Sequence, residues 1–221
     1  MVGDAGYEEA GAYLIAALEY TGTAVEFVPC QAVDDRFPST AARLAAYDLV
    51  LLSDIGADTL QITPRVADGE TDVDRCRLLA EYVANGGALG MIGGYMSFAG
   101  KHGAARYGLT AVSDVLSVAV GRADDRVEAP HGPHPQPTDA FPGSPPSNWP
   151  SILGYNLVEA DPDATVWATV DGDLLLVVGD YGDGSAVAFT TDCAPHWAPE
   201  AFLEWEYLPT LWGSILDHAS G

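Results

Sequence analysis

The chain has 221 residues, which is enough for one sizeable α/β domain with a buried core. It carries 32 acidic residues against 9 basic ones, a formal net charge of −23, so its surface repels nucleic acid and anionic membranes. We therefore expect neither as a partner. Hydrophobic residues make up 48% and are spread along the chain, which argues against disorder.

The excess of acidic residues has two explanations. It could recruit a basic partner, or it could be a solvated surface that keeps the protein soluble in concentrated salt. The acidic residues are scattered rather than gathered into a tail, which favours the second explanation and a halophilic cytoplasm. The chain has no apolar run long enough to cross a bilayer and no secretory signal pattern at its start, so we expect a soluble, cytoplasmic protein.

The first half of the sequence alternates between helix and strand patterns. Residues 1–4 look like the end of a strand whose earlier part is very short or missing. The spacing of apolar residues then predicts a helix over 8–20, strands over 24–28 and 47–54, a helix over 72–85 and a strand over 88–92. This order predicts right-handed crossovers and a mostly parallel sheet covered by helices on both faces.

The second half begins with a proline-rich stretch at 129–150 that has no periodicity. Strand patterns follow at 165–170, 174–179 and 185–191, and Gly-Asp-Gly at 182–184 predicts a hairpin between the last two. Residues 199–219 form a helical segment that Pro209 kinks or restarts. We expect a single domain over 1–221, with 129–150 as an insertion.

Chemistry-bearing side chains gather at the ends of three predicted strands. Asp54 ends one strand, Gly93, Gly94 and Tyr95 end the next, and residues 192–197 (Asp-Cys-Ala-Pro-His-Trp) end the last. Ligands of open parallel sheets bind outside the carboxyl ends of the strands. We therefore predict a small-molecule site that holds a carboxylate, a phenol, a thiol and an imidazole.

Six blocks in this order make the sequence similar to a known family. The chain resembles the putative glutamine amidotransferase family of the class I glutamine amidotransferase-like superfamily. The blocks are Ser-Asp-Ile-Gly at 53–56, Gly-Gly-Tyr-Met-Ser-Phe at 93–98, Ala-Arg-Tyr at 105–107, Leu-Gly-Tyr-Asn at 153–156, the block at 192–197 and Phe-Leu-Glu-Trp-Glu-Tyr at 202–207. The resemblance covers nearly the whole chain and implies a flavodoxin-like three-layer sandwich.

The resemblance also shows where this chain departs from glutaminases. Those enzymes use a cysteine in a Gly-x-Cys-x-Gly elbow, and a later His-Pro-Glu run supplies histidine and glutamate. Here Tyr95 stands where the cysteine belongs, and Pro-His-Trp at 195–197 has no glutamate after His196. A phenol with a pKa near ~10 is a poor nucleophile at neutral pH, so we do not expect cysteine-dependent glutamine hydrolysis.

Each candidate catalytic residue also has a structural explanation. Cys193 is the remaining thiol that could act as nucleophile, but free cysteines are commonly small buried hydrophobes. His196 could be a general base or could brace a turn, and Tyr95 could orient or protonate a substrate. Asp54 and Asp192 could bind a metal with His196, but aspartates at strand ends more often cap the next turn. We expect no metal and no cofactor.

Basic residues are scarce except just after the glycine turn. Lys101 is the only lysine, and it lies near His102 and Arg106. These residues either pair with carboxylates or bind an anionic ligand together with Gly93, Gly94 and Ser97. Two functions stay open: a hydrolase-like or binding site for a small molecule, and a non-catalytic module of the same fold that oligomerises or holds a partner.

Overall fold

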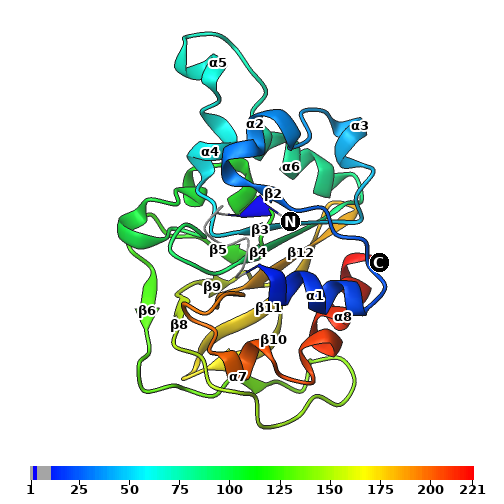
Figure 1. Ribbon diagram of the computed structural model, residues 1–221, viewed down its shortest axis with the longest axis vertical. Helices are drawn as coiled ribbons and strands as arrows, with labels where there is room; N and C mark the ends of the chain where they lie inside the picture. Colours follow the sequence, from blue (N-terminus) through cyan, green and yellow to red (C-terminus); the bar gives the residue numbers. More distant parts are fainter. Residues whose placement is uncertain (1, 4–10) are drawn as a thin grey trace.

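The computed structural model describes residues 2–3 and 11–221. Its centre is an eight-stranded sheet with the strand order β2-β1-β3-β4-β12-β11-β10-β7, and helices lie on both sides of it (Figure 1). The strands of this sheet are β1 (Val2–Gly3), β2 (Val28–Pro29), β3 (Leu49–Ser53), β4 (Ala88–Ile92), β7 (Gln136–Pro137), β10 (Thr165–Val170), β11 (Asp173–Tyr181) and β12 (Gly184–Phe189).

One half of the sheet is parallel, as the sequence predicts. β3, β4 and β12 run side by side in register from Leu49↔Ala88 to Ser53↔Ile92 and from Ser185↔Ala88 to Phe189↔Ile92. The strand predicted over 24–28 is wrong in extent, because only Val28–Pro29 pairs with the two-residue β1. The parallel pairing places the carboxyl ends of β3, β4 and β12 at one edge of the sheet.

The other half of the sheet is antiparallel. β12 pairs with β11, β11 with β10, and β10 with β7. The predicted hairpin is confirmed at Gly182, whose φ of 63° lies in the left-handed region that glycine adopts without strain. The sheet is therefore mixed, because the sequence between β11 and β12 is too short for a parallel crossover.

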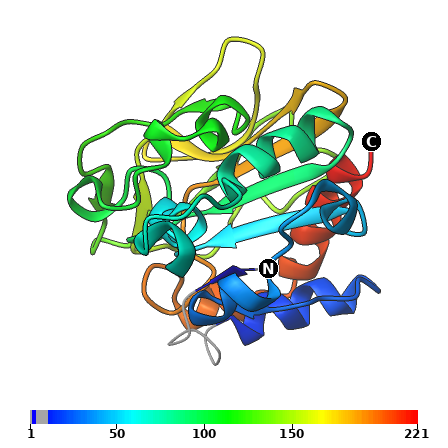
Figure 2. The same cartoon turned by 90° about the horizontal axis from the view of Figure 1, so that it is seen from above.

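The helices cover two separate apolar layers. Along β3, Val50 and Leu52 belong to the core beneath α6 (Arg75–Ala84), whereas Leu51 belongs to the core beneath α1 (Ala12–Tyr20) and α8 (Leu208–Ala219). This alternation is the two-residue period of a strand that is buried on both faces. Figures 1 and 2 show α1 and α8 together on one side of the sheet, with α6 on the other.

Local signals set the ends of the main helices. α6 begins after Asp74, whose carboxylate accepts hydrogen bonds from the backbone N–H groups of Cys76 and Arg77. Pro209 lies in the first turn of α8, so the predicted restart of the C-terminal helix is confirmed. The shorter helices are α2 (Val33–Arg36), α3 (Ala41–Leu44), α4 (Ala57–Gln61), α5 (Pro64–Ala67) and α7 (Glu200–Leu203), with 3₁₀ helices η2 (Cys30–Ala32), η3 (Lys101–Gly103), η4 (Tyr107–Leu109) and η5 (Ala111–Asp114).

The proline-rich stretch at 129–150 is part of the packed structure. It contributes β7 to the sheet edge, and it buries Phe141, which contacts both Trp149 and Trp167 in the core beneath α8. Two small antiparallel pairs lie beside the main sheet: β5 (Val118–Ala119) with β9 (Glu159–Ala160), and β6 (Arg126–Glu128) with β8 (Gly154–Asn156). Over the described part of the chain, no helix has the length and apolarity that a membrane span needs.

Candidate functional site

The carboxyl ends of β3, β4 and β12 bring the three predicted segments together. Asp54 follows β3, the turn that contains Tyr95 follows β4, and Asp192 to Trp197 follow β12. The loop before β6 and the end of β8 complete the same region, because Asn156 of β8 donates to the carbonyl oxygen of Gly94 at 3.2 Å. This edge is where parallel sheets bind ligands.

Asp54 and Ser97 fasten two of these loops to each other. The Asp54 carboxylate accepts a hydrogen bond from the backbone N–H of Met96 at 2.6 Å, and the backbone N–H of Asp54 donates to Ser97 Oγ at 3.2 Å. Asp54 adopts a φ of 48°, an uncommon conformation for a residue other than glycine. Both side chains are buried and hold the two loops together. For Asp54 this is the capping role that the sequence also allowed.

The two glycines permit close approach of backbone segments. A Cβ atom on Gly93 would lie 1.9 Å from the carbonyl oxygen of Thr190, and one on Gly94 would lie 2.7 Å from Asp54 Oδ1. Gly94 also has a φ of 151°. Close packing between the loops therefore explains why glycine is required at both positions.

The turn after β4 differs from a nucleophile elbow. An elbow is a sharp strand-to-helix turn that holds its nucleophile in a strained backbone conformation. Residues 93–100 here form turns and bends, and the next helical element is the short η3. In this turn Gly94, Phe98 and Gly100 have a positive φ, whereas Tyr95 does not. Tyr95 therefore lacks the strained backbone conformation that holds the nucleophile in an elbow.

Tyr95 instead lies in a cluster of cationic and aromatic groups. Lys101 Nζ is 4.9 Å from the centre of the Tyr95 ring, and the guanidinium carbon of Arg126 is 4.6 Å from it. The rings of His196 and Trp197 approach it edge-on, with centroid distances of 4.4 Å and 5.8 Å. Such contacts use the negative face and the positive edge of the phenol ring.

Glu128 anchors this cluster from β6. One of its carboxylate oxygens accepts the Tyr95 hydroxyl at 2.9 Å, and the other accepts Trp197 Nε1 at 3.2 Å. The hydrogen bond to Glu128 is the main reason that the pKa of Tyr95 rises above its ordinary value. The phenol therefore stays protonated at neutral pH, and it is an even weaker nucleophile than a free tyrosine.

The side chain of His196 lies near the buried carboxylate of Asp192. Its Nδ1 lies 3.9 Å from Asp192 Oδ2, and Asp192 is completely buried, whereas 37% of the His196 side chain is exposed. The backbone N–H of Cys193 donates to Asp192 Oδ1 at 2.7 Å, which fixes the carboxylate. The distance between His196 and Asp192 is longer than a hydrogen bond, so the carboxylate lies near the imidazole without accepting a hydrogen bond from it. A solvent-exposed imidazole is a side chain that can serve as a general acid or base.

Cys193 is enclosed on all sides. It is 6% exposed, and its thiol lies 3.3 Å from Ser53 Oγ within hydrogen-bonding distance. Burial raises the pKa of Cys193 to about 12, so the thiolate is scarce at neutral pH. The cavity beside it has a volume of about 10 Å³, which holds one water at most.

The remaining predicted cations have different surroundings. Arg106 adopts a φ of 64° and donates to both carboxylate oxygens of Asp58, at 2.8 Å and 3.0 Å, which is the ion-pair alternative. Lys101 takes part in no ion pair within residues 2–3 and 11–221, and its side chain is exposed. In the same ranges no three histidine, cysteine or acidic side chains are grouped as metal ligands.

Sequence reasoning missed four residues that build this edge. Asn156 is fully buried, accepts the backbone N–H of Gly94 and donates to Asp125, which in turn accepts the N–H groups of Ala99 and Gly100. Arg126 and Glu128 hold Tyr95. The Leu-Gly-Tyr-Asn block at 153–156 was a signal for Asn156, but nothing local to the sequence indicates that Asp125, Arg126 or Glu128 meets the turn after β4.

The fold and the site define an α/β protein with a polar, aromatic cluster at the carboxyl edge of a mixed sheet. The sequence also matches one protein family over almost its whole length. The chain belongs to the family described as "Putative glutamine amidotransferase" (GATase1_like), which it matches over residues 2–220. No functionally curated protein matches it.

Solved structures extend this comparison. "Cytoplasmic Protein STM1381 from Salmonella typhimurium LT2" is 40% identical with a TM-score of 0.91, and the match covers 95% of this chain and 87% of that one. Cytoplasmic Protein STM3548 from Salmonella typhimurium is 34% identical with a TM-score of 0.90 over the same shares. A β-galactosidase from Rahnella sp. R3 shares the fold alone, at 14% identity and a TM-score of 0.60, over 96% of this chain and 27% of that one.

Proposed function

We propose that the chain binds a small anionic molecule at the carboxyl ends of β3, β4 and β12, and that it does not hydrolyse glutamine through a cysteine. The supporting observation is the surroundings of Tyr95, where Lys101 and Arg126 flank the ring and His196 meets its edge. Lys101 would contact the anionic group, because Arg126 is already bound by Asp124 at 2.7 Å and 2.8 Å.

The roles of the predicted residues follow from this geometry. His196 would transfer protons, and the protonated Tyr95 hydroxyl would orient the ligand. Gly93, Gly94, Asp54 and Ser97 would shape the loops around it. The buried Cys193 is disfavoured as a nucleophile, because burial and the nearby Asp192 carboxylate raise its pKa to about 12 and keep the thiol protonated.

The proposal also includes the fold type, the cellular location and the role of the acidic surface. The order β2-β1-β3-β4-β12 matches the 2-1-3-4-5 order of flavodoxin-like sheets, which supports a flavodoxin-like three-layer sandwich that forms one domain. A cytoplasmic location is supported by two similar structures that carry the name cytoplasmic protein. We propose that the acidic surface keeps the protein soluble in concentrated salt. We also propose that copies of the chain can form homo-oligomers.

The second candidate is a non-catalytic module that binds a partner or oligomerises. It is favoured by the enclosed thiol and by the cavity of about 10 Å³ beside Cys193 and Asp192, which leaves no room for a substrate next to the thiol. The two candidates make opposite predictions for Lys101, since a partner-binding module needs no cation at the Tyr95 ring.

The test combines an activity assay with a binding assay. We expect no ammonia release from glutamine, and we expect inorganic phosphate or L-glutamate at millimolar concentration to raise the thermal midpoint of the chain. Lys101→Met should abolish that rise, whereas the control Arg65→Met should keep it, because Arg65 forms an exposed pair with Glu70. Equal responses of both variants would favour the non-catalytic module.

A further inference from the structure

A polar cavity lies at the amino-terminal ends of β4 and β12, at the opposite edge of the sheet from Tyr95. It has a volume of about 330 Å³, and its walls are the turn between β11 and β12 and the last turn of α8. We name it the hairpin cavity. It adjoins a second cavity of about 540 Å³, because Gly86, Ala219 and Ser220 line both.

Carboxylates line both cavities. The exposed side chains of Asp180 and Asp183 belong to the hairpin cavity, and those of Asp48 and Glu81 belong to its neighbour. Over the described ranges, no lysine or arginine lines either of them. Exposed carboxylates are common on a chain with a net charge of −23, so they do not mark a site by themselves.

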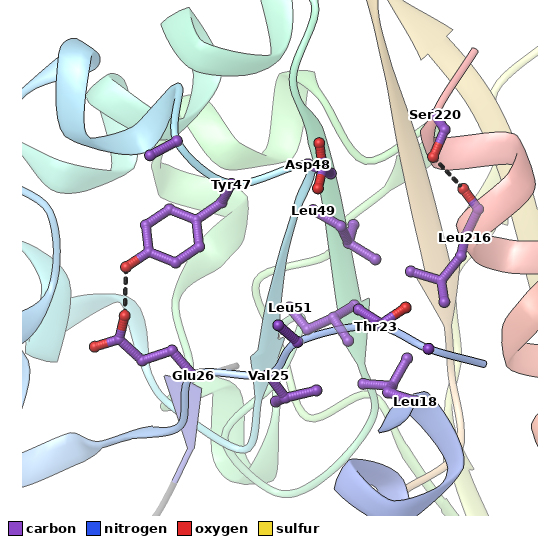
Figure 3. Close-up of a pocket in the computed structure, with 13 residues that line it drawn as sticks. Leu18, Thr23, Val25, Glu26, Tyr47, Asp48, Leu49, Leu51, Leu216 and Ser220 are labelled. Carbon is purple, nitrogen blue, oxygen red and sulfur yellow. Dashed lines mark hydrogen bonds between the residues drawn. The ribbon is translucent and has the colours of Figure 1, made fainter. Parts of the chain in front are cut away.

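The end of α8 adds negative charge to these walls. The carbonyl groups of the last turn of a helix carry a partial negative charge. One of them, the carbonyl of Leu216, accepts a hydrogen bond from Ser220 Oγ at 2.8 Å (Figure 3). α6 ends at the same edge, where the carbonyl oxygen of Ala84 accepts the backbone N–H of Asp183 at 3.1 Å and fixes the hairpin turn. This edge therefore attracts cations.

Two buried polar atoms give a second and independent observation. Ser185 is 7% exposed, and its Oγ has no hydrogen-bond partner among the described residues. The same is true of His218 Nε2, and both side chains line the hairpin cavity. An unpaired polar atom costs free energy when it is buried, so such atoms usually have a protein, water or ligand partner. These two atoms point to a ligand.

The strand pattern explains why these side chains meet at one cavity. Val187 and Phe189 belong to the core beneath α8, and Ser185 lies on the same face of β12 because side chains alternate along a strand. Asp180 is paired with Ser185 across the ladder, so its side chain also lies on this face. His218 reaches the cavity from α8, and its ring meets Trp167 edge-on at 5.6 Å.

We propose that the hairpin cavity binds a small aliphatic amine in its protonated form. An ammonium group has three N–H donors and no acceptor, so it matches walls that offer acceptors and negative charge. Asp180 and Asp183 would balance its charge, and its N–H groups would donate to Ser185 Oγ and to Nε2 of a neutral His218. Both atoms are covered from bulk water, so a rotation of each side chain towards the cavity accompanies binding.

A polyamine fits this edge better than a single amine does. The neighbouring cavity supplies a second pair of carboxylates, Asp48 and Glu81, for a second ammonium group. An organic cation also fits better than a metal ion, because no three histidine, cysteine or acidic side chains within residues 2–3 and 11–221 are grouped as metal ligands. The site is separate from the one at Tyr95, and its test does not depend on that proposal.

Isothermal titration calorimetry with spermidine in 0.15 M NaCl at pH 7.5 tests the proposal. We expect one spermidine to bind per chain with a Kd below about 1 mM. The double variant Asp180→Asn/Asp183→Asn should weaken binding about tenfold or more.

The matched control is Asp161→Asn/Asp163→Asn, which removes the same charge from exposed positions outside both cavities. It should change the affinity less than about twofold, because distant charges are screened in this buffer. Equal weakening by the two double variants would mean that spermidine acts only as a counterion, and it would overturn the proposal.

Ser185→Ala gives a second, opposed pair of readouts. Without spermidine its thermal midpoint should equal or exceed that of the parent chain, because the variant removes a buried hydroxyl that has no partner. With spermidine the affinity should fall about threefold or more. A midpoint that falls by several degrees would mean that the hydroxyl already has a structural partner, and an unchanged affinity would mean that the ligand does not reach it. Either result contradicts the proposal.

Two further arms identify the ligand and its position. Binding of MgCl₂ with the affinity of spermidine, or tighter binding of the peptide Ac-Lys-Lys-Lys-Lys-NH₂, would assign the cavity to a metal ion or to a protein partner, and either would overturn the proposal. Hydrogen exchange locates the contact: spermidine should slow exchange at the amides of Asp183 and Ser185. Protection confined to other segments would contradict the proposed position.

Discussion

Tyr95 and Cys193 are the two residues that support the proposed lack of cysteine-dependent glutamine hydrolysis. The resemblance to glutaminases predicts Tyr95 at the position of their cysteine, and the hydrogen bond from its hydroxyl to Glu128 raises the pKa of Tyr95. Cys193 lies at the same edge of the sheet, but its thiol is buried against Ser53. A reactive thiolate needs exposure and nearby positive charge, whereas Cys193 is buried and lies near the Asp192 carboxylate, and both raise its pKa.

The first prediction concerns thiol accessibility. Cys30 is partly exposed, whereas Cys76 and Cys193 are buried and burial raises the pKa of each to about 12. Iodoacetamide at pH 8 should therefore alkylate Cys30 in the native protein at least about a hundredfold faster than the other two. Peptide mass spectrometry after timed quenching measures the three rates, and rapid labelling of Cys193 would reopen its role as nucleophile.

The second prediction concerns alkaline pH. A thiol is neutral when protonated, and burial raises the pKa of Cys193 in the folded chain from its ordinary value of 9.0 to about 12. Above pH 9 the unfolded chain loses this proton while the folded chain keeps it, so stability is present below pH 9 and is lost as pH rises towards 12. Cys193 should contribute about 1 kcal/mol of this loss by pH 10.

Urea unfolding at pH 7.5 and pH 10 tests that contribution. Cys193→Ala should lose less stability between the two pH values than the parent chain, whatever the variant's stability at pH 7.5. The matched control is Cys30→Ala, which removes a partly exposed thiol and should leave the pH-dependent loss unchanged. Identical losses in all three chains would show that Cys193 ionises in the folded state as it does in the unfolded one.

At the scale of elements, the site depends on how tightly the turn after β4 packs against the end of β12. The backbone N–H of Gly93 donates to the carbonyl oxygens of Phe189 and Thr191, at 2.7 Å and 3.0 Å. This contact leaves no space for a side chain at Gly93, and it sets the position of Tyr95 two residues later. The glycines therefore control the site through the backbone.

The third prediction follows from that packing. Gly93→Ala places a Cβ atom 1.9 Å from the carbonyl oxygen of Thr190, so we expect a loss of about 3 kcal/mol or more. Gly213 in α8 is the matched control, because its nearest neighbour would lie 3.8 Å from a Cβ atom. Gly213→Ala should stabilise the helix by about 0.5–1 kcal/mol. Urea midpoints measure both, and similar midpoints would mean that the turn relaxes.

At the scale of the whole molecule, charge dominates. A net charge of −23 on 221 residues repels itself, and this repulsion favours the unfolded chain. The cations that could offset it are few, and most of those in the structure are already paired, such as Arg65 with Glu70 and Arg77 with Glu81. Stability should therefore depend strongly on the ions in solution.

The fourth prediction is a rise of thermal stability with salt. Raising NaCl from 0.05 M to 0.5 M shortens the screening length well below ~10 Å, so the midpoint should rise by several degrees. At pH 4.5, where many carboxylates approach neutrality, the same salt step should have a smaller effect. A salt effect that is equal at pH 7.5 and pH 4.5 would contradict charge repulsion as its cause.

Several elements were predictable because their patterns are local. The strands at 88–92 and 165–170 are confirmed at their predicted bounds, since continuous apolar or β-branched runs bounded by glycine determine them. The helix predicted over 72–85 is confirmed in type and begins later, at Arg75, because Asp74 caps it. The strand predicted over 24–28 forms only at its end, because pairing depends on β1 and not on its own residues.

The site was predictable only in part. The rule that parallel strands end at one edge is general, so the sequence indicated that Asp54, Tyr95 and His196 would lie near one another. The partners of Tyr95 were not predictable, since Lys101 reaches the ring from η3, and Arg126 and Glu128 reach it from β6. Contacts between segments that lie far apart in the chain leave no local pattern.

The sequence by itself determined the α/β class, the family and the absence of a cysteine at the turn after β4, because these depend on periodicity and on residue identity. Only the tertiary structure decided that the turn forms no elbow, that Cys193 is enclosed, and that Arg126 and Glu128 of β6 meet Tyr95. The reason is physical: burial, pKa and cavity shape are set by what packs around a residue, and those neighbours come from distant parts of the chain.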